Sequence, residues 1–285
     1  MNLFSGLEKF GLKLNDMNLY AEEGKDSSQG EDGAKAEAKI PIEEDFLLEK
    51  SVRCPVCDNV FKTKMVKNGR VKRLEPDKDL RPRFQYIDTL KYDISSCSVC
   101  GYTAMNRYFN HLSNAQIKLV REQISTQFHK SEEPESPCYS YDEAIDRYKL
   151  SLLNTLVKKG KNSEIAYTCL KLAWLYRGKG ETMPEDTEEE KQQKAECKEQ
   201  EESFYQQAYD GLILASSKEM FPICGMEQST VDYILSYMSA HFGKYEMASK
   251  YLSSVLTSSS ASRKMKDMAF DLKEEILVKL KNKKQ

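Results

Sequence analysis

The sequence predicts an α+β fold that is mostly α-helical, in which a small β module is followed by an array of α-helical hairpins. Two Cys-x2-Cys pairs, Cys54 with Cys57 and Cys97 with Cys100, enclose 39 residues that contain turn and strand signals. From Ser113 onward, apolar residues recur three and four positions apart, which is the period of an amphipathic helix. Two of these helical segments also share a short pattern, which indicates repeated hairpins.

The composition is typical of a folded protein that needs no disulfides. The chain has 285 residues, of which 40% are hydrophobic, enough for one large domain or two modest ones. No secretory signal opens it, and no run reaches the roughly 18 apolar residues of a membrane span. We therefore expect a soluble, cytoplasmic protein. In that reducing compartment, closely spaced cysteines favour metal binding or redox chemistry over structural disulfides.

Two N-terminal segments are predicted to lie outside the folded part. Residues 1–20 hold a short amphipathic segment, which can dock on the protein's own surface or contact a partner or a membrane. Its apolar residues at helical spacing are Leu3, Phe4, Leu7, Phe10 and Leu14. Residues 21–45 form an acidic linker, rich in Gly, Ser and charge, that is predicted to be disordered.

Residues 46–112 are predicted to form the β module. Phe61 to Val66 and Arg70 to Leu74 flank Asn68-Gly69, a dipeptide typical of type I′ hairpin turns, so these two segments are expected to pair. The stretch EPDKDLRPRF is predicted to be an irregular loop because it contains two prolines. A strand is expected within Tyr86 to Ser95, leading into the second cysteine pair.

The two cysteine pairs predict one metal site. A two-residue gap lets both sulfurs of a tight turn face one ion, and two such turns complete the tetrahedral four-thiolate shell that zinc accepts. The predicted ligands are Cys54, Cys57, Cys97 and Cys100. The 39-residue gap is longer than in the commonest zinc pattern, but a hairpin and a loop would occupy it, so the module is predicted to resemble a zinc ribbon.

Other chemistries fit the same cysteines. The pattern favours a structural zinc ion over iron, which four thiolates also bind. A redox dithiol needs only one Cys-x2-Cys pair, and a catalytic zinc normally keeps an open position that four thiolates would close. His111 and His129 follow the second pair, and either could replace one ligand.

Residues 113–282 are predicted to form the helical domain. Helices are expected over Asn114 to Ile124, Tyr141 to Val157, Ser163 to Arg177, Gln228 to His241, Tyr245 to Leu256 and Ala261 to Lys281. The third is expected to end at Gly178 and Gly180. In the charged segment Glu181 to Glu202, the first half is predicted to be a solvated insertion, and the second half to join a long helix through FYQQAYDGLILASS.

A weak repeat indicates how these helices pack. Tyr141, Ala144 and Tyr148 recur as Tyr245, Ala248 and Tyr251, and this pattern resembles the second helix of a tetratricopeptide repeat, in which the small alanine lets a paired helix approach. Because the spacing between units is irregular, we expect a degenerate tetratricopeptide-like array of hairpins.

The charge distribution is uneven. Residues 1–49 carry 12 acidic residues against 5 lysines, whereas residues 50–91 carry 12 basic residues against 5 acidic ones. The basic module can therefore be a solvated surface, or it can follow a nucleic-acid backbone through Lys62, Lys64, Lys67, Arg70, Lys72 and Arg73. The acidic arm beside it favours the first interpretation.

The stretches CPVCDNVF, DKDLRPRF and YIDTLKYDISSCSVCGYTA, with the helical remainder, resemble an uncharacterised bacterial family, domain of unknown function 2225. The resemblance covers the chain from about Ser51 to Lys281. It implies a cysteine-rich metal-binding head on a tetratricopeptide-like helical body, and it implies no activity. The four cysteines match the family's pairs, with Ser98 where proline is common. Asp77, Asp79, Arg81 and Arg83 match a further motif, for which we expect ion pairs that hold the long loop against the head.

The sequence as a whole predicts a binding protein without enzymatic activity. It contains no phosphate-binding glycine loop, no nucleophile elbow and no paired histidines. Helical hairpin arrays form concave surfaces that hold peptides, so a protein or peptide partner of the helical domain is the first expectation. A nucleic-acid-binding protein that uses residues 50–91 is the alternative, and a thiol redox or metal-sensing protein is a further one.

Overall fold

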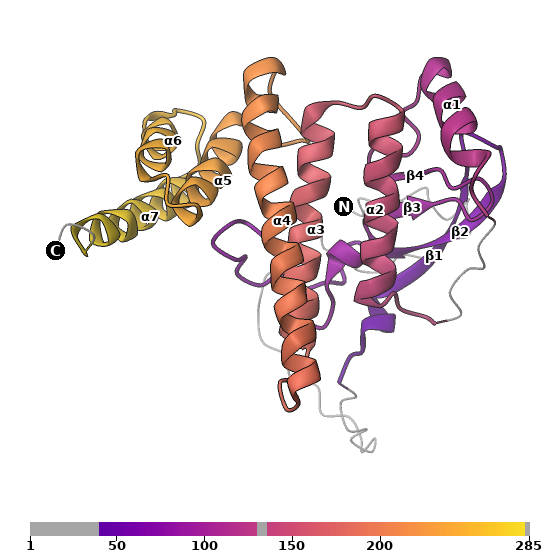
Figure 1. Ribbon diagram of the computed structural model, residues 1–285, viewed down its shortest axis with the longest axis horizontal. Coiled ribbons are helices and arrows are strands. Elements are labelled where there is room, and N and C mark those ends of the chain that lie inside the picture. Colours follow the sequence, from indigo (N-terminus) through magenta and orange to yellow (C-terminus); the bar gives the residue numbers. More distant parts are fainter. Residues whose placement is uncertain (1–39, 130–135, 283–285) are drawn as a thin grey trace, which may run out of the picture. The chain divides into compact units, whose positions relative to one another are not determined.

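The computed structural model describes residues 40–129 and 136–282 (Figure 1). Residues 41–285 make up one compact unit. The predicted amphipathic segment and most of the predicted linker lie outside the described residues. The last linker residues differ from the prediction: they belong to the short 3-10 helix η2 (Glu43–Phe46), where the Glu43 carboxylate binds Lys91 and Tyr92.

The β part consists of two antiparallel hairpins, and a cysteine pair forms the turn of each. Strand β1 (Leu47–Arg53) pairs with β2 (Val60–Val66), and the register places Arg53 opposite Val60. Strand β3 (Ile94–Ser96) pairs with β4 (Thr103–Met105). The strand expected within Tyr86 to Ser95 is therefore short, because the 3-10 helix η3 (Thr89–Tyr92) occupies the residues before it.

The hairpin predicted around Asn68-Gly69 is wrong. Gly69 does turn the chain, with a φ of 73°, but Arg70 to Leu74 forms no strand, and β2 pairs instead with β1. Within the segment expected to pair, Arg73 makes an isolated bridge to Phe84. The reason is that the tight cysteine turn reverses the chain first and gives β2 a partner of equal length on its N-terminal side.

From residue 113 the chain is helical, as predicted. The helices are α1 (Asn114–Val120), which continues as the π-helix η4 (Arg121–Ser125), α2 (Tyr141–Val157), α3 (Asn162–Thr182), α4 (Glu188–Lys218), α5 (Gln228–His241), α6 (Tyr245–Thr257) and α7 (Arg263–Asn282). The fold is thus α+β and mostly α. None of the described helices combines the length and the apolar character needed to cross a membrane.

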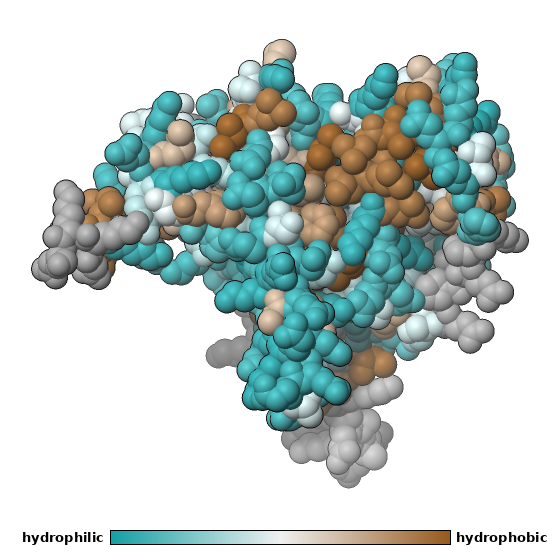
Figure 2. Space-filling view, viewed as in Figure 1, coloured by the Kyte–Doolittle hydropathy of each residue, from teal (hydrophilic) through white to brown (hydrophobic). Residues whose placement is uncertain are grey.

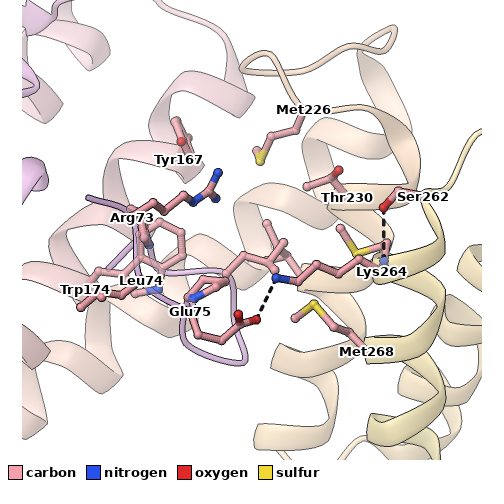
Figure 3. Close-up of a pocket in the computed structure, with 15 residues that line it drawn as sticks. Arg73, Leu74, Glu75, Tyr167, Trp174, Met226, Thr230, Ser262, Lys264 and Met268 are labelled. Carbon is pink, nitrogen blue, oxygen red and sulfur yellow. Dashed lines mark hydrogen bonds and ion pairs between the residues drawn. The ribbon is translucent and has the colours of Figure 1, made fainter. Parts of the chain in front are cut away.

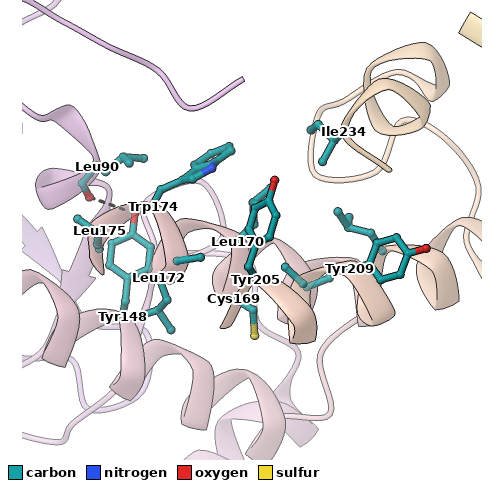
Figure 4. Packing of buried hydrophobic residues seen from close by; sticks show 14 of the residues in the cluster. Leu90, Tyr148, Cys169, Leu170, Leu172, Trp174, Leu175, Tyr205, Tyr209 and Ile234 are labelled. Atoms are coloured by element: carbon teal, nitrogen blue, oxygen red, sulfur yellow. Dashed lines mark hydrogen bonds between the residues drawn. The ribbon is translucent and has the colours of Figure 1, made fainter. Parts of the chain in front are cut away.

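The helices pack mainly as neighbours in sequence. Helix α3 lies along α4, α5 packs on α6, and α2 packs both on α3 and on the strands β3 and β4. Trp174, Tyr205 and Tyr209 are nearly inaccessible within the main core, and Tyr148 donates a hydrogen bond to the carbonyl of Leu90 in η3 (Figure 4). This core therefore joins the helices to the β part.

One face of α2 carries exposed leucines. Leu153 and Leu156 are 48% and 53% exposed, and Leu152 and Val157 beside them are half-buried. Figure 2 shows that apolar side chains gather over this end of α2.

Helix α3 runs past the glycines that were expected to end it. Gly178 and Gly180 both lie inside the helix, which continues to Thr182. A Cβ atom on Gly178 would lie 2.7 Å from Nη2 of Arg81 and 2.8 Å from the ring of Tyr141, so glycine makes room there for a side chain from a distant loop. A packing requirement, and not a helix stop, accounts for this glycine.

The two glycines make a matched pair of substitutions. Gly178→Ala is expected to lower the free energy of unfolding by about 1–3 kcal/mol, because the overpacked Arg81 side chain is itself buried and cannot move aside. In Gly180→Ala the nearest atom to the new methyl group is 3.8 Å away, so nothing is overpacked. The higher helix propensity of alanine should raise the free energy of unfolding by up to about 1 kcal/mol. Urea unfolding followed by circular dichroism measures both. Equal effects would contradict the packing argument.

Candidate metal centre

The two cysteine turns have the same backbone geometry. The N–H of Asp58 donates to the carbonyl of Cys54 at 2.9 Å, and the N–H of Gly101 donates to the carbonyl of Cys97 at 3.0 Å. Asp58 and Gly101, each directly after the second cysteine of its pair, have positive φ angles of 60° and 74°. At Gly101 a Cβ atom would also lie 2.5 Å from the ring of Phe128. Each turn therefore directs two sulfurs to one side.

The structure brings together all four cysteines that the sequence singles out. The Sγ atoms of Cys54, Cys57, Cys97 and Cys100 all lie within 4.8 Å of one another and form a group that could hold a metal ion. The Sγ atoms of Cys54 and Cys100 are 3.5 Å apart, and those of Cys57 and Cys97 are 3.7 Å apart. A tetrahedral zinc ion with bonds of about 2.3 Å places its sulfurs about 3.8 Å apart, so the cluster fits such an ion. Neither His111 nor His129 belongs to the group.

The cluster lies inside a hydrophobic core of its own. Cys54, Cys97 and Cys100 are buried, and Cys57 is half-buried. Val56, Phe61, Tyr102, Phe109, Val120 and Ile124 are the buried residues that pack with them. The four sulfurs can fill the tetrahedral shell of one ion, so the arrangement suits a structural ion.

The sulfurs stabilise one negative charge strongly among themselves. Hydrogen bonds from the thiols of Cys100 and Cys54 hold the pKa of Cys97 below that of a free thiol. The pKa of Cys100 is raised, because its hydrogen bonds to Cys54 and Cys97 keep the proton in place. One of the four thiols therefore loses its proton easily, whereas removing the protons of the others is unfavourable. A divalent cation at the centre would offset this unfavourable free energy.

Polar contacts fix both turns to the helices. The guanidinium of Arg121, at the start of η4, donates from Nε to the carbonyl of Val56 inside the first turn at 2.7 Å, and Nη2 donates to the same oxygen. Nδ2 of Asn154, in α2, donates to the carbonyl of Gly101 beside the second turn at 3.0 Å. Groups that orient ligands in this way tune a metal site from outside its shell.

The loop between the cysteine pairs carries the second motif, Asp77, Asp79, Arg81 and Arg83; we call Asp77 to Arg83 the ionic loop. Arg83 pairs with Asp77 at 2.7 Å and binds both carboxylate oxygens of Glu181, at 2.7 and 2.8 Å. The buried guanidinium of Arg81 pairs with Glu181 at 3.1 Å and with Asp88 at 3.4 Å. Ion pairs within and around this loop were expected and are present.

Asp79 is the most deeply buried acid of the ionic loop, with no exposed surface. Its Oδ2 accepts a hydrogen bond from Nε1 of Trp174 and pairs with Nη2 of Arg177, both at 2.8 Å. Burial alone would raise the pKa of this carboxyl, but the Arg177 guanidinium outweighs it and the pKa lies below its ordinary value. Asp79 is therefore an anion whose partners come from α3.

These contacts correct one expectation. The ionic loop was expected to be held against the cysteine-rich head, but apart from Asp88 the partners of its buried groups, Trp174, Arg177 and Glu181, belong to α3. Glu181 was expected to lie in a solvated insertion. No local pattern pairs residues about 100 positions apart, so the sequence held no signal for these contacts.

The basic side chains of the β module are partly engaged by the protein itself. Lys62, Lys64 and Lys67 contact, in turn, the carboxylate of Glu49 at 3.0 Å and the carbonyl oxygens of Ser136 and Asp45. Nucleic-acid binding through residues 50–91 stays a prediction.

Fold and site together define a class: a mostly helical protein whose small β part carries four cysteines able to hold one metal ion. The family described as "Uncharacterized protein conserved in bacteria (DUF2225)" matches residues 47–276, and the chain belongs to this family. The resemblance seen in the cysteine pairs is thereby confirmed. Comparisons with curated proteins and with solved structures gave no significant match.

Proposed function

We propose that this protein is a non-enzymatic scaffold of the bacterial cytoplasm, with a structural zinc ion in its head and a protein partner on its helical, tetratricopeptide-like domain. The observation that carries the proposal is the closed cluster of Cys54, Cys57, Cys97 and Cys100. A set of four thiolates that fills the tetrahedral shell of its ion stabilises a fold and offers no open position for a substrate. The protein-binding function then belongs to the surfaces of the zinc-bound head and of the helices.

Zinc is the ion that this donor set favours. Structural zinc sites are tetrahedral and closed; both turns here have the Cys-x2-Cys spacing of such sites, and the sulfur pairs between the turns are 3.5 and 3.7 Å apart, close to the separation that such sites need. Iron binds the same donors, so the test below separates the two by element.

Exposed apolar surface supports a protein partner. Leu153 and Leu156 on α2 form part of one apolar area, and a groove that crosses α3 forms another. Contiguous apolar surface of this kind marks protein interaction sites in soluble proteins.

One preparation tests both parts of this proposal. The tagged full chain is cross-linked in its native cells and purified; elemental mass spectrometry measures its metal, and protein mass spectrometry identifies what is cross-linked to it. We expect one zinc per chain, four thiols protected until a chelator is added, and specific proteins above a tag-only control. No protein above that control would overturn the scaffold function. Iron, or four reactive thiols without metal, would overturn the structural zinc.

A further inference from the structure

Two cavities join into one groove across α3. The first has a volume of about 690 Å³ and lies between the segment Arg73 to Pro82 and helices α3, α5 and α7. The second, of about 600 Å³, lies between β2, η3 and α3. Both are lined by Arg73, Pro82, Tyr167 and Trp174, so the two cavities adjoin at these four residues, and we call them together the Arg73 groove.

Both ends of the Arg73 groove carry apolar side chains. Toward α7 it is lined by Leu74, Leu80, Met226, Met265 and Met268, and Figure 3 shows Met226 and Met268 on the side facing the loop. The apolar side chain of Leu74 is 43% exposed and can therefore contact a ligand. Toward β2 the lining includes Met65, Val66 and Phe84. Flexible methionines suit a surface that adapts to apolar side chains of a partner.

The centre of the groove carries a positive charge without a partner. Arg73 is exposed, and its guanidinium makes no hydrogen bond or ion pair with any residue in the described part of the chain. The other cations of the lining are engaged: Lys264 pairs with Glu75 at 2.9 Å, Lys171 pairs with Asp93, and the guanidinium of Arg107 donates to the carbonyl of Cys224. Figure 3 shows the Arg73 guanidinium directed toward Tyr167, into the groove.

We propose that the Arg73 groove binds an extended segment of a partner protein in which one acidic side chain, paired with Arg73, is flanked on both sides by apolar side chains. This inference rests on the proposed protein-binding function and assigns its site. Arg73 lies where the two cavities meet and apolar lining continues on both sides of it, so the acid belongs to the middle of the segment and not to a chain end. The planar guanidinium can bind a carboxylate through two parallel hydrogen bonds.

The charge of the lining favours an acidic ligand over a nucleic acid. One free cation at the centre of an apolar groove matches one carboxylate, whereas a phosphate backbone needs a row of cations. Lys171 and Lys264 are already paired, and a duplex would have to displace their acids.

Random 12-residue peptides displayed on phage, selected on the full zinc-loaded chain, test the proposal. Wild-type protein should enrich peptides with an internal Asp or Glu between apolar residues. Arg73→Glu should bind these peptides at least about tenfold more weakly in fluorescence anisotropy, and should itself enrich Lys or Arg at the same place. The matched control is Lys72→Glu, which changes the same charge on a neighbouring exposed side chain that does not line the groove.

Three results would overturn the proposal: no enriched peptide, enriched peptides that bind Arg73→Glu as tightly as wild type, or equal weakening by Lys72→Glu. Because the Arg73 guanidinium has no hydrogen bond or ion pair to lose among the described residues and the bridge to Phe84 is made by the backbone, the variant should unfold at the wild-type urea concentration, so weak binding cannot be ascribed to misfolding. If Arg73→Glu still captures the cross-linked partners of the wild type, the groove assignment fails while the scaffold function stands. If the wild type captures none, the scaffold function fails.

Discussion

Cys54→Ser should release the metal and lower the free energy of unfolding by more than about 4 kcal/mol. Cys54 has no exposed surface, and its sulfur lies at the centre of the core that Val56, Phe61 and Phe109 share. Metal binding and folding of such a head are one equilibrium, so the loss of one thiolate removes both. Elemental mass spectrometry measures the zinc, and urea unfolding followed by circular dichroism measures stability.

The control is Cys138→Ser. Cys138 is half-buried and lies outside the cluster, so this variant should keep one zinc per chain and change stability by less than about 1 kcal/mol. A Cys54→Ser chain that holds zinc with wild-type stability would contradict a structural metal site.

Asp79→Asn should cost about 1.5–3 kcal/mol of stability at neutral pH. The substitution removes the buried carboxylate that pairs with Arg177 at 2.8 Å, while that guanidinium keeps its ion pairs with Glu201 at 2.7 Å and with Asp77 at 3.4 Å. Glu75→Gln is the matched control, since Glu75 pairs with Lys264 at 2.9 Å, nearly the same distance, but both side chains are more than 60% exposed. An exposed pair contributes less than about 1 kcal/mol. Equal effects of the two substitutions in urea unfolding would refute the role of burial.

The Asp79 carboxyl also predicts a pH dependence. Its pKa is lowered in the folded protein, so the stabilisation is fully present above the unfolded pKa of about 3.9 and is lost as the pH falls through the folded value. The stability difference between wild type and Asp79→Asn should therefore be constant from about pH 5 to 7 and shrink below about pH 4. A difference that stays constant down to pH 2 would show that the carboxylate charge is not the cause.

The helices could be predicted because their signal is local. Tyr141 to Val157 and Gln228 to His241 were expected from apolar periodicity alone, and α2 and α5 have these bounds. The end of α3 could not be predicted in the same way. A glycine can end a helix, or it can lie inside a helix where another group packs closely. At Gly178 the second case holds, because the side chain of Arg81, far away in sequence, packs there.

The strand prediction was wrong where β2 is flanked by two possible turns. Asn68-Gly69 is a good turn, but the turn at Cys54 to Cys57 gives β2 a seven-residue antiparallel partner in β1. The cysteine spacing was sufficient to predict that the four sulfurs lie together. The contacts of the ionic loop and the Arg73 groove could not be predicted, because they depend on the position of α3. Such sites are assembled by tertiary packing, and a single sequence contains no periodic trace of them.

The place of the ionic loop between the two cysteine pairs has a consequence for metal capture. In an unfolded chain the 39 residues between Cys57 and Cys97 form a flexible ring, whose closure costs about 3 kcal/mol of entropy. When Asp79 and Arg81 are held on α3, this ring is divided into two short arcs with fixed ends. The helices thereby raise the effective concentration of one sulfur pair at the other, and the affinity for an ion bound there would depend on how completely the helical domain is folded.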